Sequence, residues 1–246
     1  MTPYAEVEIL GVPIAALTFV EAVELLVAQI PFSRPYVVFT PNPEMIDRSC
    51  RDRDFRKMLK TAHLLLPDGI GVVWASRLLA SSPLRETVPG VDVMEALLHA
   101  GAENGWSVFF LGTTPESLEL AVDRAEMKFP GLKICGYHHG YLAADDEDAV
   151  IEKINEAQPH ITISGMGIPR DQRFLSNHRA ALPPGLYLAI GGGLDILAGT
   201  TKRAPDWIRR CHCEWLYRLL SSPSRWRRQL ALPRFVMRVL RKRLAL

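Results

Sequence analysis

The chain has few cysteines and no long uncharged apolar run. Only four of its 246 residues are cysteine, at irregular spacings, which argues against a disulfide framework and predicts reduced thiols. Nowhere do about 18 uncharged apolar residues follow one another, so we expect no membrane-spanning helix. The first residues show no basic stretch followed by an apolar run, so we expect no signal peptide and a cytoplasmic protein. A hydrophobic content of 48% excludes disorder.

Common nucleotide and metal fingerprints are also missing. No glycine-bearing turn matches a strict dinucleotide-binding fingerprint or a phosphate-binding loop with Gly-Lys-Ser/Thr, which disfavours a nicotinamide enzyme and an ATPase. The pair Asp52 and Asp54 has the Asp-x-Asp form that holds a divalent cation on a diphosphate in some sugar transferases. These residues begin an arginine-rich helical pattern, however, and this favours helix capping over metal binding. We therefore predict no metal site.

Basic residues are concentrated near the C-terminus. The last 44 residues hold twelve basic and two acidic residues, a net charge of +10, whereas the preceding 202 residues carry −8. Trp207, Trp215, Tyr217, Trp226 and Phe235 are interleaved with these basic residues. A segment that is both cationic and aromatic suits an anionic and partly apolar partner, such as phospholipid head groups or pyrophosphates.

Short β-rich runs alternate with longer helical patterns up to about residue 199. This order is typical of βαβ units and predicts an α/β fold with a Rossmann-like, mainly parallel sheet flanked by helices. The expected strands are Val7–Leu10, Tyr36–Thr40, His63–Leu66, Ser107–Leu111, Lys133–Gly136, His160–Ser164 and Leu186–Ile190. The expected helices are Phe19–Ile30, Asp54–Ala62, Gly71–Leu79, Val91–Asn104, Pro115–Phe129, Asp145–Ala157 and Arg170–Leu182.

After about residue 199 the alternation of strands and helices ends, and only helical patterns follow, interrupted by three prolines. We predict a catalytic body at residues 1–199 and a basic, amphipathic helical appendage at residues 200–246. Near the C-terminus, Arg234, Arg238 and Arg241 recur at helical spacing, so this helix could lie flat in a lipid interface. The alternative is an amphipathic helix that packs on the body with its arginines in water.

Polar residues directly follow two of the expected strands. Thr40 and Asn42 follow one apolar run, and Asp68 follows the next. Because ligands bind at the carboxyl ends of the strands in an open parallel sheet, we expect these side chains in the site. A carboxylate there can act as a general base toward a hydroxyl group, with Thr40 and Asn42 holding a sugar hydroxyl or orienting the base. The alternative is that Asp68 is only a turn residue in Pro-Asp-Gly.

Glycine-bearing turns follow three further strands, at Gly112, at Gly165 and Gly167, and at Gly192. Bare backbone N–H groups and the positive end of a helix can receive phosphate oxygens, so a nucleotide or a nucleotide sugar is the natural ligand. The alternative is ordinary turn chemistry, because glycine is the usual residue wherever a strand turns sharply into a helix.

Nine ordered stretches make the chain similar to the WecG/TagA/CpsF family of glycosyltransferases over nearly its whole length. The stretches are Thr40-Pro41-Asn42, Leu66-Pro67-Asp68-Gly69, Pro89-Gly90-Val91-Asp92, Phe110-Leu111-Gly112, Gly136-Tyr137-His138-His139-Gly140-Tyr141, Gly165-Met166-Gly167-Ile168-Pro169, Gly191-Gly192-Gly193-Leu194-Asp195, Arg203-Ala204-Pro205 and Glu214-Trp215-Leu216-Tyr217-Arg218 with Pro223 and Arg225.

The resemblance implies an enzyme with a Rossmann-like body and a C-terminal appendage that completes the active site and attaches the protein to the inner face of the plasma membrane. Members transfer a hexose, with inversion, from a UDP-sugar to a polyprenyl-diphosphate-linked sugar in cell-surface polysaccharide biosynthesis. The expected partners are therefore a UDP-sugar such as UDP-glucose or UDP-ManNAc, a lipid-linked sugar acceptor and an anionic membrane surface. No cofactor is expected.

Carried over by motif, the catalytic base falls on Asp68, with Thr40 and Asn42 beside it. The expected UDP-binding residues are Gly112, Gly165, Gly167, Asp171, Gln172, Gly192 and Asp195. The expected diphosphate-binding residues are Arg218, Arg225 and Arg228. UDP leaves with growing negative charge, and without a metal that charge needs protein cations and helix N-termini.

Two positions depart from the family pattern. Pro169-Arg170-Asp171-Gln172 stands where the family commonly shows Pro-Lys-Gln-Glu, and Thr87 stands where an arginine is common. Both changes lie where recognition of the donor or the acceptor is expected, so the sequence leaves the identity of the sugars open.

Two other functions are compatible with parts of this pattern. One is a nonenzymatic nucleotide-binding body with a basic tail for nucleic acid, and the other is an inactive scaffold of the same pathway. The amphipathic tail and the polar residues at the strand ends favour the enzyme, so we expect no nucleic-acid partner. A homo-oligomer is possible, because an exposed apolar tail can pack against a neighbouring subunit as well as in lipid.

Overall fold

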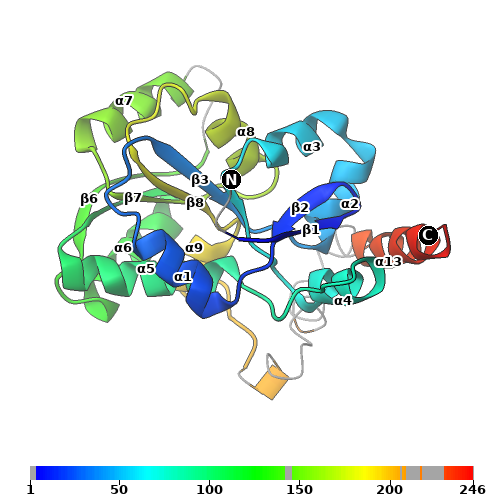
Figure 1. The fold of residues 1–246 in the computed structure, drawn as a ribbon. Coiled ribbons are helices and arrows are strands. Elements are labelled where there is room, and N and C mark those ends of the chain that lie inside the picture. Colours follow the sequence, from blue (N-terminus) through cyan, green and yellow to red (C-terminus); the bar gives the residue numbers. More distant parts are fainter. Residues whose placement is uncertain (1–3, 142–145, 206, 209–216, 218–229, 246) are drawn as a thin grey trace.

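The computed structural model describes residues 4–141, 146–205, 207–208, 217 and 230–245. A six-stranded parallel sheet with the order β4-β3-β8-β7-β5-β6 lies at its centre (Figure 1). The strands are β3 (Pro35–Phe39), β4 (Leu64–Leu65), β5 (Ser107–Gly112), β6 (Lys133–His138), β7 (Ile161–Gly165) and β8 (Gly185–Ala189). The expected parallel α/β fold is confirmed.

A separate antiparallel hairpin precedes this sheet. It consists of β1 (Glu6–Ile9) and β2 (Val12–Ala15). The two residues between the strands, Leu10 and Gly11, have φ angles of 51° and 88°, and a two-residue type I′ turn requires positive φ at both positions. The expected first strand therefore exists but lies outside the parallel sheet, and its partner β2 was not expected.

Helices cover both faces of the sheet. Because side chains alternate along a strand, Val37 and Phe39 of β3 enter one core while Val38 enters the other. The first core also contains side chains from α2 (Pro43–Arg51), α3 (Arg53–Lys60), α4 (Ile70–Leu79), α7 (Glu147–Ala157) and α8 (Arg170–Asn177). The second contains side chains from α1 (Phe19–Val27), α5 (Gly90–Asn104), α6 (Pro115–Lys128) and α9 (Gly193–Leu197).

The C-terminal helix α13 (Ala231–Leu244) packs against α2 and α4 at one end of the molecule (Figure 1). Phe235 and Val239 are fully buried in this contact. Leu240 and Leu244 remain 45% and 88% exposed on the same helix. The helix thus packs on the body and also keeps an exposed apolar face. No helix in the described part of the chain is long and apolar enough to span a bilayer. The domain boundary after residue 199 stays a prediction.

Candidate active site

A cavity of about 1850 Å³ opens at the carboxyl edge of the parallel sheet. Most of the site residues predicted from the sequence meet there, although they come from five different segments. The predicted residues that line it are Thr40, Asn42, Asp68, Gly165, Gly167, Gln172, Gly192 and Asp195. Gly112 and Asp171 are not among the described residues that line the cavity. Arg218, Arg225 and Arg228 lie outside the described residues.

Asp68 stands between β4 and α4, and its backbone N–H donates to the carbonyl of Pro41 at 3.1 Å. That bond ties the loop after β4 to the loop after the neighbouring strand β3. Gly69 is the N-cap residue before α4 (Ile70–Leu79) and has a φ angle of 89°, a conformation that favours glycine. The Pro-Asp-Gly turn therefore aims the half-buried Asp68 at the edge of the sheet where the cavity lies.

Thr40 and Asn42 are fixed by their own contacts. The hydroxyl group of Thr40 donates a hydrogen bond to the carbonyl oxygen of Ala189 in β8, at 3.4 Å. Asn42 caps α2 by accepting a hydrogen bond from the backbone N–H of Met45 at 3.0 Å. A Cβ atom at Gly90 would lie 2.9 Å from the Thr40 hydroxyl oxygen, so the glycine of the Pro-Gly pair lets the N-terminus of α5 approach Thr40.

The glycine turns after β5 and β7 lie directly against each other. The backbone N–H of Thr113 donates to the carbonyl of Gly165 at 3.1 Å. A Cβ atom at Gly112 would lie 2.3 Å from the carbonyl carbon of Gly165, so only glycine fits there. At Gly167 and Gly191 a Cβ atom would meet nothing within 4 Å. Gly112 therefore lets the turns after β5 and β7 touch, while Gly167 and Gly191 present open backbone to the cavity.

Asp171 is fully buried beneath the turn after β7. Its carboxylate accepts hydrogen bonds from the Ser164 hydroxyl at 2.7 Å and from the backbone N–H groups of Met166 at 2.9 Å and Gly167 at 3.1 Å. Burial raises the pKa of this carboxyl from 3.8 to about 7, although these hydrogen bonds oppose the rise. Asp171 therefore holds the shape of the glycine turn.

Gln172 is the neighbouring residue on α8 and lines the cavity, although it is only 2% exposed. Its Oε1 atom has no hydrogen-bond partner among the described residues. A buried amide oxygen without a partner is costly, so a ligand that donates a hydrogen bond would be favoured at this position.

A hydroxyl and carboxylate cluster at the sheet edge was not predicted as a unit. Both Thr113 and Ser117 donate hydrogen bonds to Oδ1 of Asp195, the latter at 2.9 Å. Thr113 has a φ angle of 55°, which is unusual for a β-branched residue. The sequence placed Asp195 at a strand end, but its contact with residues about 80 positions away depends on the strand order.

The described wall of the cavity carries more acidic than basic side chains. Its carboxylates belong to Glu44, Asp68, Glu86, Asp92, Glu95 and Asp195. Its cations belong to Arg170, Lys202 and Arg203. Arg203 pairs with Asp92 at 2.6 Å.

Within the described residues, no group of three or more His, Cys, Asp and Glu side chains is placed to hold a metal ion. Asp52 caps α3 by accepting from Phe55 at 2.9 Å.

A parallel α/β body whose carboxyl edge opens into a cavity between several helix N-termini has the arrangement of a nucleotide-binding enzyme. The model of the glycosyl transferase WecG/TagA/CpsF family matches residues 7–246. The chain belongs to this family, and it is therefore a glycosyltransferase. Membership favours the enzyme over the nonenzymatic alternatives.

Relatives of known name support the same assignment. The N-acetylglucosaminyldiphosphoundecaprenol N-acetyl-beta-D-mannosaminyltransferase of Bacillus subtilis (strain 168) is 34% identical over 206 residues, which are 84% of this chain and 79% of that protein. The protein of the same name from Staphylococcus aureus (strain MW2) is 31% identical over 238 residues, or 96% of this chain and 92% of that protein.

Proposed function

We propose that the protein transfers a hexose, with inversion, from a UDP-sugar to an N-acetylglucosaminyl-diphospho-polyprenol. The names of the two relatives support this acceptor and support N-acetylmannosamine as the transferred sugar. The observation that carries the proposal is the placement of Asp68, Thr40 and Asn42 in one cavity with open glycine turns. The pathway is the building of a cell-surface polysaccharide on the inner face of the plasma membrane.

In the proposed reaction, Asp68 takes the proton from the acceptor hydroxyl. The hydroxyl oxygen then forms a bond to the anomeric carbon from the side opposite UDP. The bond from that carbon to the UDP oxygen breaks, and its electron pair leaves with the diphosphate. Attack from the opposite side inverts the anomeric centre. Thr40 and Asn42 orient the acceptor, and the glycine turns bind UDP through their backbone N–H groups.

The proposal also assigns charge compensation to the C-terminal appendage. UDP and the acceptor each bring a diphosphate, yet the described wall has six carboxylates and three cations, one of which is already paired with Asp92. Arg218, Arg225 and Arg228 are therefore proposed to neutralise the diphosphates without a metal ion. Replacing each by alanine should lower kcat more than it lowers the affinity for either sugar.

The test of the transferase proposal is UDP release from a panel of UDP-sugars in the presence of N-acetylglucosaminyl-diphospho-polyprenol. We expect UDP-ManNAc to be turned over fastest. Asp68→Asn should lower kcat by about 10²- to 10⁴-fold while changing the KM of the donor only a few-fold, because a general base acts mainly in the transition state.

The matched control is Asp54→Asn. Asp54 lies on α3, is 78% exposed and pairs only with Lys57 among the described contacts, so this substitution removes a carboxylate outside the cavity. Its kcat should stay within twofold of the unsubstituted protein. Undiminished UDP release by Asp68→Asn would overturn the assignment of the base, and failure of every UDP-sugar would overturn the transferase proposal.

Attachment to an anionic membrane is proposed for the outer face of α13. Leu240 and Leu244 are exposed there, and Arg241 and Arg243 lie beside them in the last turn. Such a face suits an interface that is both apolar and negatively charged. Sedimentation with vesicles should show stronger binding to phosphatidylglycerol than to phosphatidylcholine, and Leu240→Ala with Leu244→Ala should weaken it. Equal binding to both vesicle types would contradict the proposal.

A further inference from the structure

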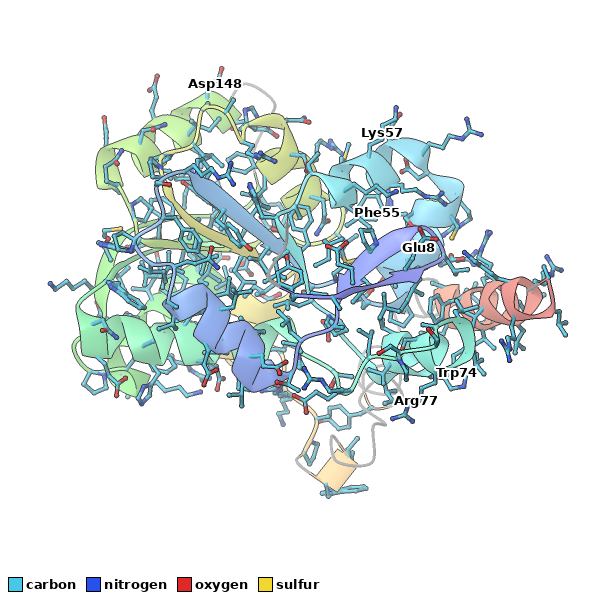
Figure 2. All side chains as sticks on the ribbon, in the orientation of Figure 1. Glu8, Phe55, Lys57, Trp74, Arg77 and Asp148 are labelled. Atoms are coloured by element: carbon cyan, nitrogen blue, oxygen red, sulfur yellow. The ribbon has the colours of Figure 1, made fainter. Side chains whose placement is uncertain are left out.

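The cavity has an apolar extension on the side away from the glycine turns. Ile70 and Trp74, one turn apart on α4, line it, and so do Leu232 and Val236, one turn apart on α13. Phe235 and Pro43 also line this part of the cavity. We call the space bounded by these six residues the α4–α13 groove. Figure 2 labels Trp74 on α4, close to α13.

The floor of the groove depends on Gly71. A Cβ atom at Gly71 would lie 2.8 Å from Pro43 and 3.9 Å from the ring of Phe235. The absence of a side chain there lets α2, α4 and α13 come together. Phe235 is 1% exposed and Val236 is 37% exposed, so the floor is anchored in the core while the rim is open. The groove therefore has an apolar floor and belongs to the same cavity as Asp68.

Asp68 and the groove lie in a fixed order along α4. Asp68 and Gly69 precede the helix, Ile70 begins it, and Trp74 follows one turn later. At 1.5 Å of rise per residue, Trp74 lies about 6 Å along the axis from Ile70, the first residue of the helix after Asp68 and Gly69. A molecule that places a reactive sugar hydroxyl at Asp68 and extends along α4 would therefore meet polar surface first and apolar surface next.

We propose that the α4–α13 groove binds the first isoprene units of a polyprenyl diphosphate acceptor. The proposal rests on the proposed function, because it takes the acceptor hydroxyl to be at Asp68. The acceptor is a linear amphiphile with a sugar at one end, a diphosphate in the middle and a hydrocarbon chain at the other. The cavity likewise has a polar end at Asp68 and an apolar end at the groove, and its volume of about 1850 Å³ exceeds the roughly 300–1000 Å³ of a site for one small ligand.

The position of α13 is part of this site. Arg234 and Arg238 pair with Asp47 of α2 at 3.4 Å and 3.0 Å, and these contacts lie on the same helix as Leu232 and Val236. One wall of the groove is thus supplied by the C-terminal helix and the other by α4, which begins next to Asp68. The groove assigns α13 a role in acceptor binding that does not require a membrane.

The test compares two soluble acceptors that share an N-acetylglucosaminyl-diphosphate head. One carries three isoprene units and the other carries a methyl group, and both are assayed without membranes or detergent at a saturating donor concentration. We expect the isoprenyl acceptor to have a KM at least about tenfold lower, because each buried methylene group favours binding. In Trp74→Ala with Val236→Ala, this KM ratio should fall toward one, and in Trp74→Phe it should be largely retained.

Leu120→Ala is the matched control. Leu120 is 45% exposed, similar to Val236, but it lies on α6, far from α13 (Figure 1). The KM ratio should stay unchanged in this variant. An equal KM for both acceptors in the unsubstituted protein would overturn the groove. So would a double variant that loses both acceptors equally, because Trp74 would then contact the sugar.

A binding measurement separates the groove from the transferase proposal. Farnesyl diphosphate contains the isoprene units and the diphosphate but no sugar, so its binding can be measured by calorimetry without turnover. Affinity that falls about tenfold in Trp74→Ala with Val236→Ala supports the groove even if no UDP-sugar is used. Transfer activity with no effect of these substitutions on farnesyl diphosphate binding would overturn the groove and leave the transferase intact.

Discussion

Nε of Arg238 lies 3.0 Å from Oδ1 of Asp47 and thereby joins the C-terminal helix to α2. Arg234 and Arg51 approach Oδ2 of the same carboxylate, at 3.4 Å and 2.8 Å. Asp47 is 0% exposed, whereas the three arginines are between 35% and 47% exposed. Only the carboxylate is buried in this cluster. Without the arginines Asp47 would be a buried charge with fewer partners, whereas the arginines would remain hydrated.

Asp47→Asn should loosen α13 without unfolding the body. The substitution removes the charge that holds two arginines of α13, and a hydrogen bond to a charged group is worth about 1.5–3 kcal/mol when it is not exposed. Because the arginines are partly exposed, solvent screening reduces this free energy. We therefore expect amide hydrogen exchange in α13 to become about tenfold faster. The measurement is exchange resolved by segment, with α6 as the internal reference.

Asp54→Asn provides the comparison for this prediction. Asp54 also forms an ion pair, with Lys57 at 3.0 Å, but both side chains are about 80% exposed. Exposed pairs contribute little, so exchange in α13 and the free energy of unfolding should barely change. If exchange in α13 were unchanged in Asp47→Asn, the packing of Phe235 and Val239 would hold the helix without the ionic contact.

The substitutions Gly112→Ala and Gly167→Ala should differ strongly in how much they lower the free energy of unfolding. At Gly112, with a φ angle of 136°, a Cβ atom would overlap the backbone of Gly165, so Gly112→Ala must separate β5 from β7. At Gly167, with a φ angle of 88°, a Cβ atom meets nothing, so Gly167→Ala should cost only the backbone strain of about 1–2 kcal/mol. Urea unfolding should show a clearly larger loss for Gly112→Ala, and equal losses would contradict the close approach.

The elements of the fold could be predicted from the sequence where apolar runs are long. All six strands of the parallel sheet were expected, with ends that differ by at most two residues. The helix α2 was missed, because Pro43 and the charged residues after Asn42 resemble a loop, yet proline is favoured in the first turn and Asn42 supplies the cap. The helix α8 ends at Asn177, five residues earlier than expected.

The candidate site could be predicted only in part. Asp68, Thr40 and Asn42 were expected to meet because each follows a strand of one parallel sheet. The contact of Thr113 and Ser117 with Asp195 could not be predicted, because it requires knowing that β7 lies between β5 and β8. The burial of Asp171 was also hidden, since a carboxylate after a glycine turn reads as a ligand-binding residue. In the structure its three hydrogen bonds hold the turn, and its contact with UDP stays a prediction.

The buried carboxyl of Asp171 should make the free energy of unfolding depend on pH. Burial raises its pKa in the folded state to about 7 from the ordinary value of 3.8. Between these pH values the folded chain holds a proton that the unfolded chain has lost, so stability falls as pH rises. The slope from this one group is at most about 1.4 kcal/mol per pH unit and disappears above the folded-state pKa.

Asp171→Asn should remove that slope, although it also lowers the absolute stability by changing the hydrogen bond to Gly167. The measurement is the free energy of unfolding from urea titrations between pH 4 and pH 8, and the quantity compared is the difference between the two proteins at each pH. The exposed Asp148→Asn on α7 is the reference substitution. A pH-independent difference between Asp171→Asn and the unsubstituted protein would show that Asp171 does not take up the proton.

The cluster around Asp195 predicts that Thr113 affects donor binding indirectly, by orienting the carboxylate of Asp195. Thr113 donates a hydrogen bond to Asp195, and Asp195 lines the cavity next to the open glycine turn after β8. Thr113→Val keeps the branched shape but removes the donor, so Oδ1 of Asp195 keeps only its hydrogen bond from Ser117 and is held less firmly. If Asp195 contacts the donor, the KM of the UDP-sugar should rise about five- to tenfold while kcat and the KM of the acceptor change less.

Thr61→Val is the matched substitution for this last prediction. The Thr61 hydroxyl donates to the carbonyl of Met58 at 2.7 Å, and Thr61 is not among the described residues that line the cavity. It should leave both KM values unchanged. Ser117 also donates to Asp195, at 2.9 Å, so Ser117→Ala should shift the KM of the donor in the same direction as Thr113→Val. A rise in the KM of the acceptor alone would place Asp195 on the acceptor side, because a loosened carboxylate weakens only the ligand that it contacts.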